Sequence, residues 1–535
     1  MAETSSREAE GISLNVLFSL LLAIAVVLLW IVPLTSSFWI DEIVSAFIIR
    51  NGGDHPSLAV APQVVESIYY ALPSASEKLF GFSEIAYRLP SLLAMGVALF
   101  LITRIAIRLI HPQAGWFALF GCLALGGFNY QAADARPYAL GTCVAAAGIL
   151  FLIRWLDEGR WQDATLFALF AALLWRVHLI YWPIYIVFLL YAILRRVWGE
   201  TRVGWLPLAG VFLLITVALI PVLLTAVSIL QEAGSHVIVP VPTLRAFVNS
   251  LKAGLVVGCF AGIGVCRWLA VTSAEKTDTG ATGLRSLLRF PARKTQIAEE
   301  GKSPSKSAIF LVLAYWLGQP LALFVFSHLT GNSVYVSRYL YVALPGVALT
   351  AALCVAYYQE PQYWKKVTLL LAAVVLLNSG AWGDGWPRHD FSDWRSAARA
   401  INQLKLGADT PVVCPSPFIE ANPPDWSPSY SLPGFLYGHL QIYPIESRPY
   451  LFPFEYSREG EEYALSFVRE ELQRSGRFVV YGGAKNVRDW TKWFGRRPEL
   501  ADWQEYNVGP FGNVEIVVFE KSRGISKKQK LQLAN

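Results

Sequence analysis

The first apolar run of the chain, residues 14–34, reads LNVLFSLLLAIAVVLLWIVPL. At a rise of 1.5 Å per residue, a helix of this length crosses the roughly 30 Å hydrocarbon core of a bilayer. The run is too long for the apolar region of a signal peptide, and no small-residue cleavage site follows it. We therefore expect a retained transmembrane helix.

The same length criterion divides the first 382 residues into about eleven apolar segments. The candidate spans are 14–35, 88–110, 114–130, 136–156, 162–177, 179–195, 204–230, 247–271, 308–329, 339–358 and 366–382. This pattern predicts an α-helical polytopic membrane module over residues 1–382.

The composition excludes two other classes of protein. Apolar residues make up 54% of the chain and charged residues 16%; soluble globular domains have about 25% charged residues, and disordered chains have little apolar content. The net charge of +6 comes from Lys and Arg at the ends of apolar segments, so membrane topology explains it and we expect no nucleic-acid partner.

The charges of the loops predict an orientation. The loop 36–87 is rich in acidic residues, whereas basic residues gather in alternate loops, including the long segment 272–307. Because cytoplasmic loops carry an excess of Lys and Arg, the loop 36–87 is expected to be exoplasmic and 272–307 cytoplasmic. This places the N-terminus in the cytoplasm and, with an odd number of spans, the C-terminus outside.

Residues 383–535 have a different composition, with frequent charges and prolines and no further run of spanning length. We expect a small exoplasmic α/β domain there, for which acceptor recognition or product positioning is the natural role. Helical periodicity covers 394–404 and 461–474, and β-rich runs cover 411–413, 478–481 and 514–519.

Two adjacent carboxylates, Asp41 and Glu42, follow the first span by a few residues. Near the lipid interface, desolvation can make a carboxylate a useful proton acceptor, so the pair is a candidate for general-base catalysis. The alternative is that the acids enforce orientation or begin an interfacial helix, where they complement the helix dipole.

A second candidate is the run from Asp134 to Tyr138, at the exoplasmic mouth of the fourth predicted span. Pro137 suits the first turn of a helix and would hold Arg136 at the rim, where a guanidinium can bind a phosphate with two hydrogen bonds. An Arg136–Asp134 ion pair or a snorkelling anchor is the alternative.

Arg338 and Arg88 also stand at exoplasmic ends of predicted spans, against the usual charge bias. Together with Arg136 they indicate a cationic rim rather than three independent anchors. The histidines His178 and His328 lie near the same side, where each is either a structural residue or a ligand.

The order of these motifs resembles the GT-C membrane glycosyltransferases, in particular bacterial members related to protein O-mannosyltransferases and to the aminoarabinose transferase of lipid A. The matching runs are the acidic pair at 41–42, Ser-Glu-x-x-x-Arg-Leu-Pro at 83–90, Ala-Arg-Pro-Tyr-Ala-Leu at 135–140, the mid-chain His178, Ser-Arg-Tyr at 337–339 and Asp-Trp-Arg-Ser-Ala-Ala at 393–398.

This resemblance implies an enzyme that transfers a hexosyl or pentosyl group from a polyprenyl-phosphate donor to a hydroxyl acceptor outside the cytoplasmic membrane, with inversion. It implies Asp41 as the catalytic carboxylate beside Glu42, and donor-phosphate binding by Arg136, Arg338 and Arg88. The expected substrate pocket is completed by a further group of residues: Tyr138, His178, Tyr339 and Asp134.

Some members of the family use a divalent metal, for which the candidate ligands here are Asp41, Glu42, His178 and His328. No other cofactor is expected, and the protein is expected to be a monomer in a bacterial inner membrane. Two other functions compete with this one: transport of a lipid-linked sugar between leaflets, and a non-catalytic role in cell-envelope assembly.

Overall fold

The computed structural model describes residues 2–51, 67–232, 239–274, 304–360, 363–380, 388–419, 421–423, 426 and 435–522. The chain divides into two compact units. Residues 1–34 and 61–387 form the first, called the membrane unit below, and residues 35–60 and 388–535 form the second, called the α/β unit. Most of the predicted cytoplasmic loop 272–307 and the middle of the loop 36–87 lie outside the described residues.

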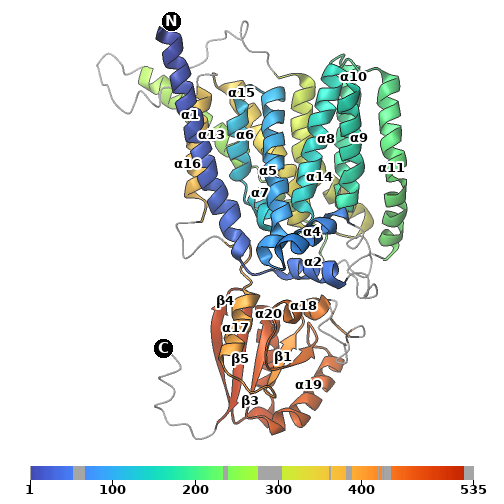
Figure 1. Cartoon of the computed structure of the whole chain (residues 1–535), viewed down its shortest axis with the longest axis vertical. Helices are drawn as coiled ribbons and strands as arrows, with labels where there is room; N and C mark the ends of the chain where they lie inside the picture. Colours follow the sequence, from blue (N-terminus) through green and yellow to red (C-terminus); the bar gives the residue numbers. More distant parts are fainter. Residues whose placement is uncertain are drawn as a thin grey trace. The chain divides into compact units, whose positions relative to one another are not determined.

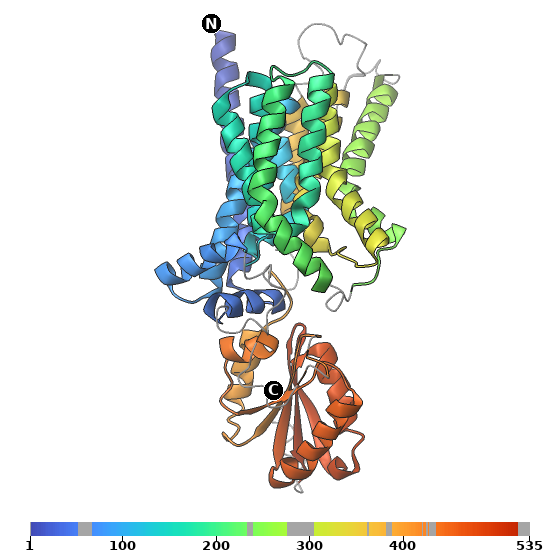
Figure 2. The same cartoon turned by 90° about the vertical axis from the view of Figure 1, so that its right-hand side faces the viewer.

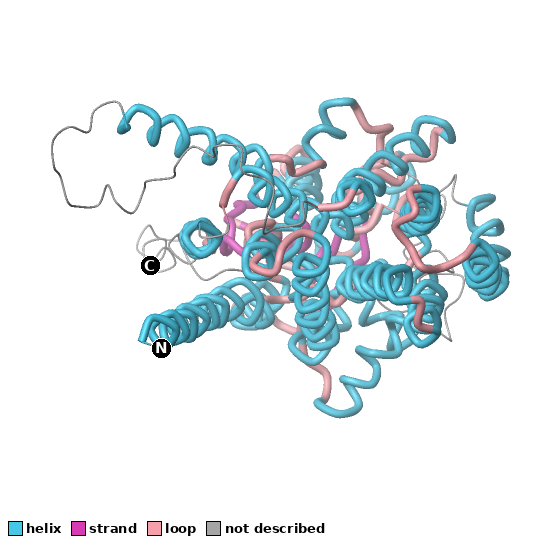
Figure 3. Tube along the Cα trace, turned by 90° about the horizontal axis from the view of Figure 1, so that it is seen from above, coloured by secondary structure: helices cyan, strands magenta, loops and turns pink. Residues whose placement is uncertain are grey.

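The membrane unit is a bundle of helices (Figures 1 and 3). Its α-helices are α1 (Ala2–Val26), α4 (Ala71–Phe80), α5 (Glu84–Leu109), α6 (Ala114–Leu123), α7 (Gly126–Tyr130), α8 (Tyr138–Glu158), α9 (Trp161–Val177), α10 (Trp182–Val197), α11 (Trp205–Glu232), α12 (Leu244–Ser250), α13 (Gly254–Ala274), α14 (Lys306–Thr330), α15 (Leu344–Tyr358) and α16 (Trp364–Leu377). Short helices join or extend them: η1 (Val27–Ile31), η2 (Val32–Thr35), η4 (Ile68–Tyr70), η5 (Gln131–Ala133), η6 (Leu179–Tyr181) and η9 (Ser337–Ala343).

Each of the eleven predicted apolar segments overlaps a helix in its described residues, but the count of about eleven spans is not confirmed. Among the described residues, seven helical segments are long and apolar enough to cross a membrane, or eight if the bent pair α12 and α13 is one span. The difference comes from short helices: α6 has 10 residues, α9 has 17 and α16 has 14.

Glycines allow close packing in the bundle interior. A Cβ atom at Gly148 would lie 2.9 Å from the ring of Phe188, and one at Gly346 would overlap the backbone of Trp316. Because lipid tails are as apolar as the helix surfaces, helices in a bilayer associate through such close van der Waals contact. These glycines therefore bring α8 against α10 and α15 against α14.

The α/β unit contains a β-sheet flanked by helices (Figure 2). The sheet has five strands in the order β2-β1-β3-β5-β4. Strands β2, β1 and β3 are parallel to one another, and β5 is antiparallel to both β3 and β4. The elements are α2 (Ile40–Asn51), α17 (Trp394–Gln403), β1 (Pro411–Pro415), η11 (Phe435–Tyr437), α18 (Gly438–Ile442), β2 (Arg448–Phe452), α19 (Arg458–Glu470), η12 (Leu472–Arg474), β3 (Arg477–Gly483), α20 (Ala484–Phe494), η13 (Pro498–Leu500), β4 (Trp503–Phe511) and β5 (Val514–Lys521).

Alternate residues of β3 serve the two faces of the sheet. Phe478 and Val480 join the apolar core formed with α19 and α20, where Phe478 stacks on Phe519 at 4.6 Å. Tyr481 lies on the opposite face, against Trp394 of α17 and His439 of α18. Helices thus cover both faces, and the predicted fold class, a helical membrane protein with a small C-terminal α/β domain, is confirmed.

The sequence predicts β1, β3 and β5 but not β2 and β4. The missed strands are the two edges of the sheet. Along β4, the described residues are exposed or half-buried, and β2 begins with two exposed residues, so neither carries the continuous apolar run that marks a strand covered on both faces. The interior strand β1 is buried along its whole length.

The face of the sheet toward α17 and α18 contains buried polar atoms. Both ring nitrogens of His439, the indole nitrogen of Trp394 and the hydroxyl of Tyr481 have no hydrogen-bond partner among the described residues. The rings of His439 and Trp394 lie 4.5 Å apart. Burial lowers the pKa of His439 to about 3, so the imidazole is neutral at physiological pH.

The α/β unit should therefore lose stability as the pH falls below about 6.5. An unfolded histidine takes up a proton near that pH, whereas the native state accepts it only near the lowered pKa of His439, so protons favour the unfolded state. The expected loss is about 2 kcal/mol at pH 5. Hydrogen exchange of β3 and β5 amides, corrected for intrinsic rates, measures it. A His439→Phe variant with the same pH dependence would contradict this origin.

Candidate functional site

The acid pair begins helix α2 in the α/β unit. Glu42 is fully buried, and its Oε2 accepts a hydrogen bond from the backbone N–H of Trp39 at 3.2 Å. This is the reciprocal half of a capping box, in which a glutamate at the third helical position satisfies the N-terminal amide. Asp41 is half-buried. Of the two acids, Glu42 thus has the structural role of beginning a helix.

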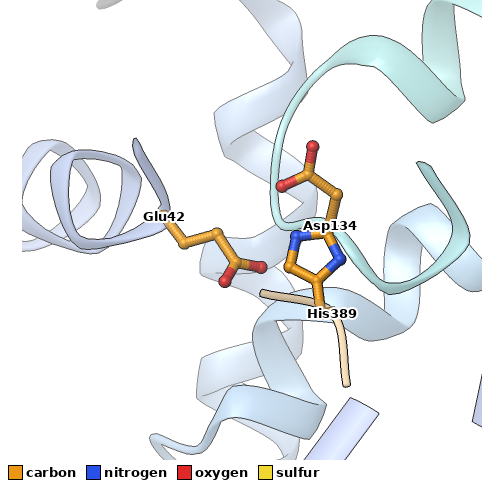
Figure 4. Close-up of side chains that lie close together, drawn as sticks. All are labelled: Glu42, Asp134 and His389. Atoms are coloured by element: carbon orange, nitrogen blue, oxygen red, sulfur yellow. The ribbon is translucent and has the colours of Figure 1, made fainter. Parts of the chain in front are cut away.

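His389, a residue that the sequence analysis did not select, lies beside Glu42 in the α/β unit. A ring nitrogen of His389 and a carboxylate oxygen of Glu42 are within 4.8 Å of each other (Figure 4). The His389 ring also meets that of Trp39 edge-on at 6.2 Å, and its backbone N–H donates to Ser36. The third labelled side chain in the figure, Asp134, belongs to the membrane unit.

Replacing Glu42 with Ala should destabilise the first turn of α2 by about 1 kcal/mol, because the amide of Trp39 loses its acceptor. Glu42→Gln keeps an amide oxygen that can accept the same bond and should retain most of this stability. Hydrogen exchange of α2 peptides compares the two variants. Equal exchange in Glu42→Ala and wild type would contradict the capping role.

In the membrane unit, a polar network holds the loop before α8. Asn129 accepts from the indole of Trp30 at 3.0 Å, Gln131 accepts from Thr142 at 2.7 Å, and the backbone carbonyl of Arg136 accepts from Ser91 at 3.5 Å. Pro137 precedes the first residue of α8, one position earlier than expected. The loop thereby holds Arg136, whose side chain is almost fully buried.

Arg136 and Arg338 meet at the ring of Tyr138. The Nε of Arg338 donates to the Tyr138 hydroxyl at 3.1 Å, and the guanidinium carbon of Arg136 lies 5.9 Å from the Tyr138 ring centroid. The rings of His178 and Tyr339 lie 5.9 and 6.0 Å from that of Tyr138. We call these five residues the Arg–Tyr cluster. Segments about 200 residues apart in the sequence therefore form one cluster of cationic and aromatic side chains.

His178 is a neutral member of this cluster. It lies between α9 and the span that begins at Leu179, and its Nδ1 accepts the backbone N–H of Ile180 at 3.2 Å. Desolvation, followed by the charges of Arg136 and Arg338, lowers the pKa of His178 to about 3. Because Nδ1 is an acceptor in a neutral ring, the proton resides on Nε2, which can donate one hydrogen bond.

Two residues that support the Arg–Tyr cluster were missed in the sequence. The side-chain amide of the fully buried Gln319 donates to the carbonyl of Ile180 at 2.9 Å and to that of Tyr339 at 3.1 Å, which ties η6 to η9. A Cβ atom at Gly141 would overlap the ring of Tyr181. A single glutamine within an apolar span is the signal that could have pointed to Gln319.

Arg88 has a different environment from the other two arginines. It is fully buried, and its Nη1 donates to the carbonyls of Pro33 at 3.3 Å and Leu34 at 2.9 Å. These contacts join α5 to the end of the first apolar helix. Ser83 of the same motif is the N-cap of α5 and accepts from the amide of Ala86. These contacts hold the backbone of neighbouring elements in place.

Two of the predicted metal ligands, His178 and His328, are histidines of the membrane unit. Among the described residues, neither His178 nor His328 belongs to a set of three or more His, Cys, Asp or Glu ligand atoms within 4.8 Å of one another. His178 lies near two guanidinium groups, which repel a cation, and Nε2 of His328 contacts the carbonyl of Pro242 at 3.0 Å. Both histidines are therefore poor candidates for a divalent metal.

The Arg–Tyr cluster has the chemistry of a phosphate site. Two guanidinium groups supply positive charge and paired donors, and the neutral imidazole adds a single donor. Asp134, in the loop that also carries Arg136, is fully buried in the membrane unit. Asp41 belongs to the α/β unit, so its action together with the Arg–Tyr cluster is a prediction.

Two comparisons relate this chain to known proteins. The family model described as dolichyl-phosphate-mannose-protein mannosyltransferase matches residues 68–223, under a third of the chain. That segment includes Arg88, Arg136 and His178, while Arg338 and the acid pair lie outside it. The comparison with curated proteins gave no match.

The chain is also similar to two crystal structures of ArnT from Cupriavidus metallidurans. The apo structure is 14% identical, with a TM-score of 0.51, over 95% of this chain and 98% of that one. The structure bound to undecaprenyl phosphate is 13% identical, with a TM-score of 0.50, over 94% and 97%. At this identity the likeness shows the fold, and the resemblance indicated by the motifs is confirmed at that level.

Proposed function

We propose that this protein is a membrane glycosyltransferase that moves a hexosyl or pentosyl group from a polyprenyl-phosphate donor to a hydroxyl acceptor. The observation that carries the proposal is the meeting of Arg136 and Arg338 at Tyr138. A phosphate that leaves a sugar gains negative charge, and two guanidinium groups stabilise that charge where it develops.

The proposed reaction is a single displacement at the anomeric carbon. The acceptor oxygen forms a bond to this carbon, its proton passes to the carboxylate of Asp41, and the bond from the carbon to the phosphate oxygen breaks. The polyprenyl phosphate leaves with the electron pair and is held by Arg136 and Arg338, with Nε2 of His178 as a further donor. Because the acceptor attacks opposite the leaving group, the sugar inverts.

Asp41 and the Arg–Tyr cluster belong to different units, so their action at one reacting centre is part of the proposal. It is supported by the motif order that the chain shares with GT-C glycosyltransferases. The undecaprenyl phosphate bound to ArnT, a protein of the same fold, supports a polyprenyl-phosphate carrier. The family description, which names a dolichyl-phosphate-mannose enzyme, supports a lipid-phosphate-linked sugar.

The loop charges support an inner-membrane protein of a bacterium with a cytoplasmic N-terminus and an exoplasmic α/β unit, where transfer takes place. A monomer suffices for this reaction, because a single chain carries the proposed base and both arginines. The α/β unit is proposed to assist acceptor recognition or product positioning.

The test is reconstitution of the purified protein in vesicles that contain hexosyl and pentosyl polyprenyl phosphates. Glycosyl transfer requires that free polyprenyl phosphate and a glycosylated acceptor appear in equal amounts. Movement of the intact carrier between leaflets without its consumption would identify a transporter. Neither consumption nor movement, with every donor and a range of hydroxyl acceptors, would favour an assembly protein.

A further inference from the structure

Helix α2, which carries Asp41, belongs structurally to the α/β unit. Residues 35–60 cluster with residues 388–535, although the sequence places them in a loop of the membrane module. Within this unit α2 packs against α18 and η11. The position of the Asp41 carboxylate therefore depends on elements that follow it by about 400 residues.

Hydrogen bonds anchor the segment that leads into α2. The backbone N–H of Phe38, three residues before Asp41, donates to the hydroxyl of Tyr443 at 2.9 Å. The side chain of Phe38 is fully buried. One residue earlier, Ser37 accepts the backbone N–H of Arg395 at 3.3 Å. The segment before α2 is thus bonded to one residue that precedes β1 in the sequence and to one that follows it.

Gly438 allows α18 to lie close to α2. A Cβ atom at Gly438, the first residue of α18, would lie 2.9 Å from Cγ2 of Ile43. Ile43 is fully buried and stands two residues after Asp41. Real Cβ atoms essentially never approach another atom this closely, so a side chain at position 438 requires a shift at this contact. Because Ile43 is β-branched and fully buried, its side chain has little freedom to rotate, and we expect α2 to move relative to α18.

We propose that Gly438 and Tyr443 are positioning residues that set the placement of the Asp41 carboxylate. The proposal rests on the function proposed above, in which Asp41 is the base. A base must lie within hydrogen-bond reach of the proton it accepts, and a displacement of about 1 Å can cost a hundredfold in rate. The α/β unit then contributes directly to the rate of transfer and not to acceptor choice alone.

The test measures kcat, the KM for the donor and hydrogen exchange of residues 37–49 in Gly438→Ala and Tyr443→Phe. We expect kcat to fall about tenfold to a hundredfold in Gly438→Ala, the KM to stay within about threefold, and exchange in α2 to rise. Tyr443→Phe, which removes one hydrogen bond and adds no bulk, should have a smaller effect in the same direction.

Matched controls come from the same unit. Gly476→Ala adds a methyl group that meets no atom of the described residues within 4 Å. Tyr450→Phe removes a phenol that donates to Glu471 at 2.6 Å. Both should retain the wild-type kcat. Ile43→Ala removes the methyl group that Gly438→Ala would meet, so adding Gly438→Ala to Ile43→Ala should lower kcat less than threefold.

The outcomes separate this inference from the proposed function. Wild-type protein that transfers no sugar overturns the proposed function. Active wild-type protein, with Gly438→Ala and Tyr443→Phe matching it in kcat, overturns the positioning role alone, whether or not exchange in α2 rises. Equal loss of kcat on adding Gly438→Ala with and without Ile43→Ala also overturns it, because the effect would then not pass through this contact.

Discussion

Asp41→Asn should lower kcat by a factor of about 10² to 10⁴ while the KM for the donor changes less than threefold. A positioned general base contributes this much, and asparagine has nearly the same size but cannot accept the proton of the acceptor. The loss appears in kcat because the base acts in the transition state and does not hold the donor.

The measurement is transfer of sugar by the purified variant at saturating donor and acceptor. Asp409→Asn is a suitable control, since it makes the same change at an exposed position of the α/β unit. Hydrogen exchange of α2 establishes that the helix is intact. Transfer by Asp41→Asn at the wild-type rate would remove Asp41 as the base and, with it, the chemical part of the proposed mechanism.

Arg338→Gln should lower kcat/KM by a factor of about 10² to 10³ and weaken binding of the free polyprenyl phosphate. Glutamine keeps a hydrogen-bond donor but removes the charge that stabilises the leaving phosphate, and loss of one such preorganised group typically costs this much. Arg338→Lys should recover only part of the rate, because an ammonium cannot bind with the planar fork of a guanidinium.

A double variant tests whether the two arginines act together. Arg136→Gln and Arg338→Gln should each cause a large loss, and the combined loss should be smaller than the product of the two, because both residues bind one leaving group. Arg160→Gln is the matched control, since Arg160 is exposed and its ion pair with Glu158 at 2.9 Å lies on the surface. Independent, multiplicative losses would argue against a shared phosphate.

Part of the candidate site could be predicted from the sequence because the chemical properties of a side chain follow from its residue type. An arginine at the exoplasmic end of a span goes against the usual charge bias, so Arg136 and Arg338 could be selected one at a time. The same argument selected Arg88, whose described contacts are to the carbonyls of Pro33 and Leu34. Composition cannot tell that Arg88 contacts backbone carbonyls whereas Arg136 and Arg338 meet at Tyr138.

Other features depend on distances that no local pattern encodes. The role of Gln319 requires two carbonyls, of Ile180 and Tyr339, to come within 3.1 Å of its amide. The role of Gly438 requires the side chain of Ile43, nearly 400 residues away in the sequence, to lie against it. The edge strands β2 and β4 were missed because a strand covered less completely needs no long apolar run.

The sequence by itself determined the class of the protein, the helical segments and the interior strands, and it supplied the candidate residues for phosphate binding and proton transfer. The length of an apolar segment and the periodicity of its apolar residues are local properties, so they can be recognised in the sequence. Only the tertiary structure decided that Arg136 and Arg338 meet at Tyr138, and that the helix of Asp41 joins the α/β unit. Such meetings depend on how side chains pack across the fold, because short-range contacts between distant segments form only once the chain has folded.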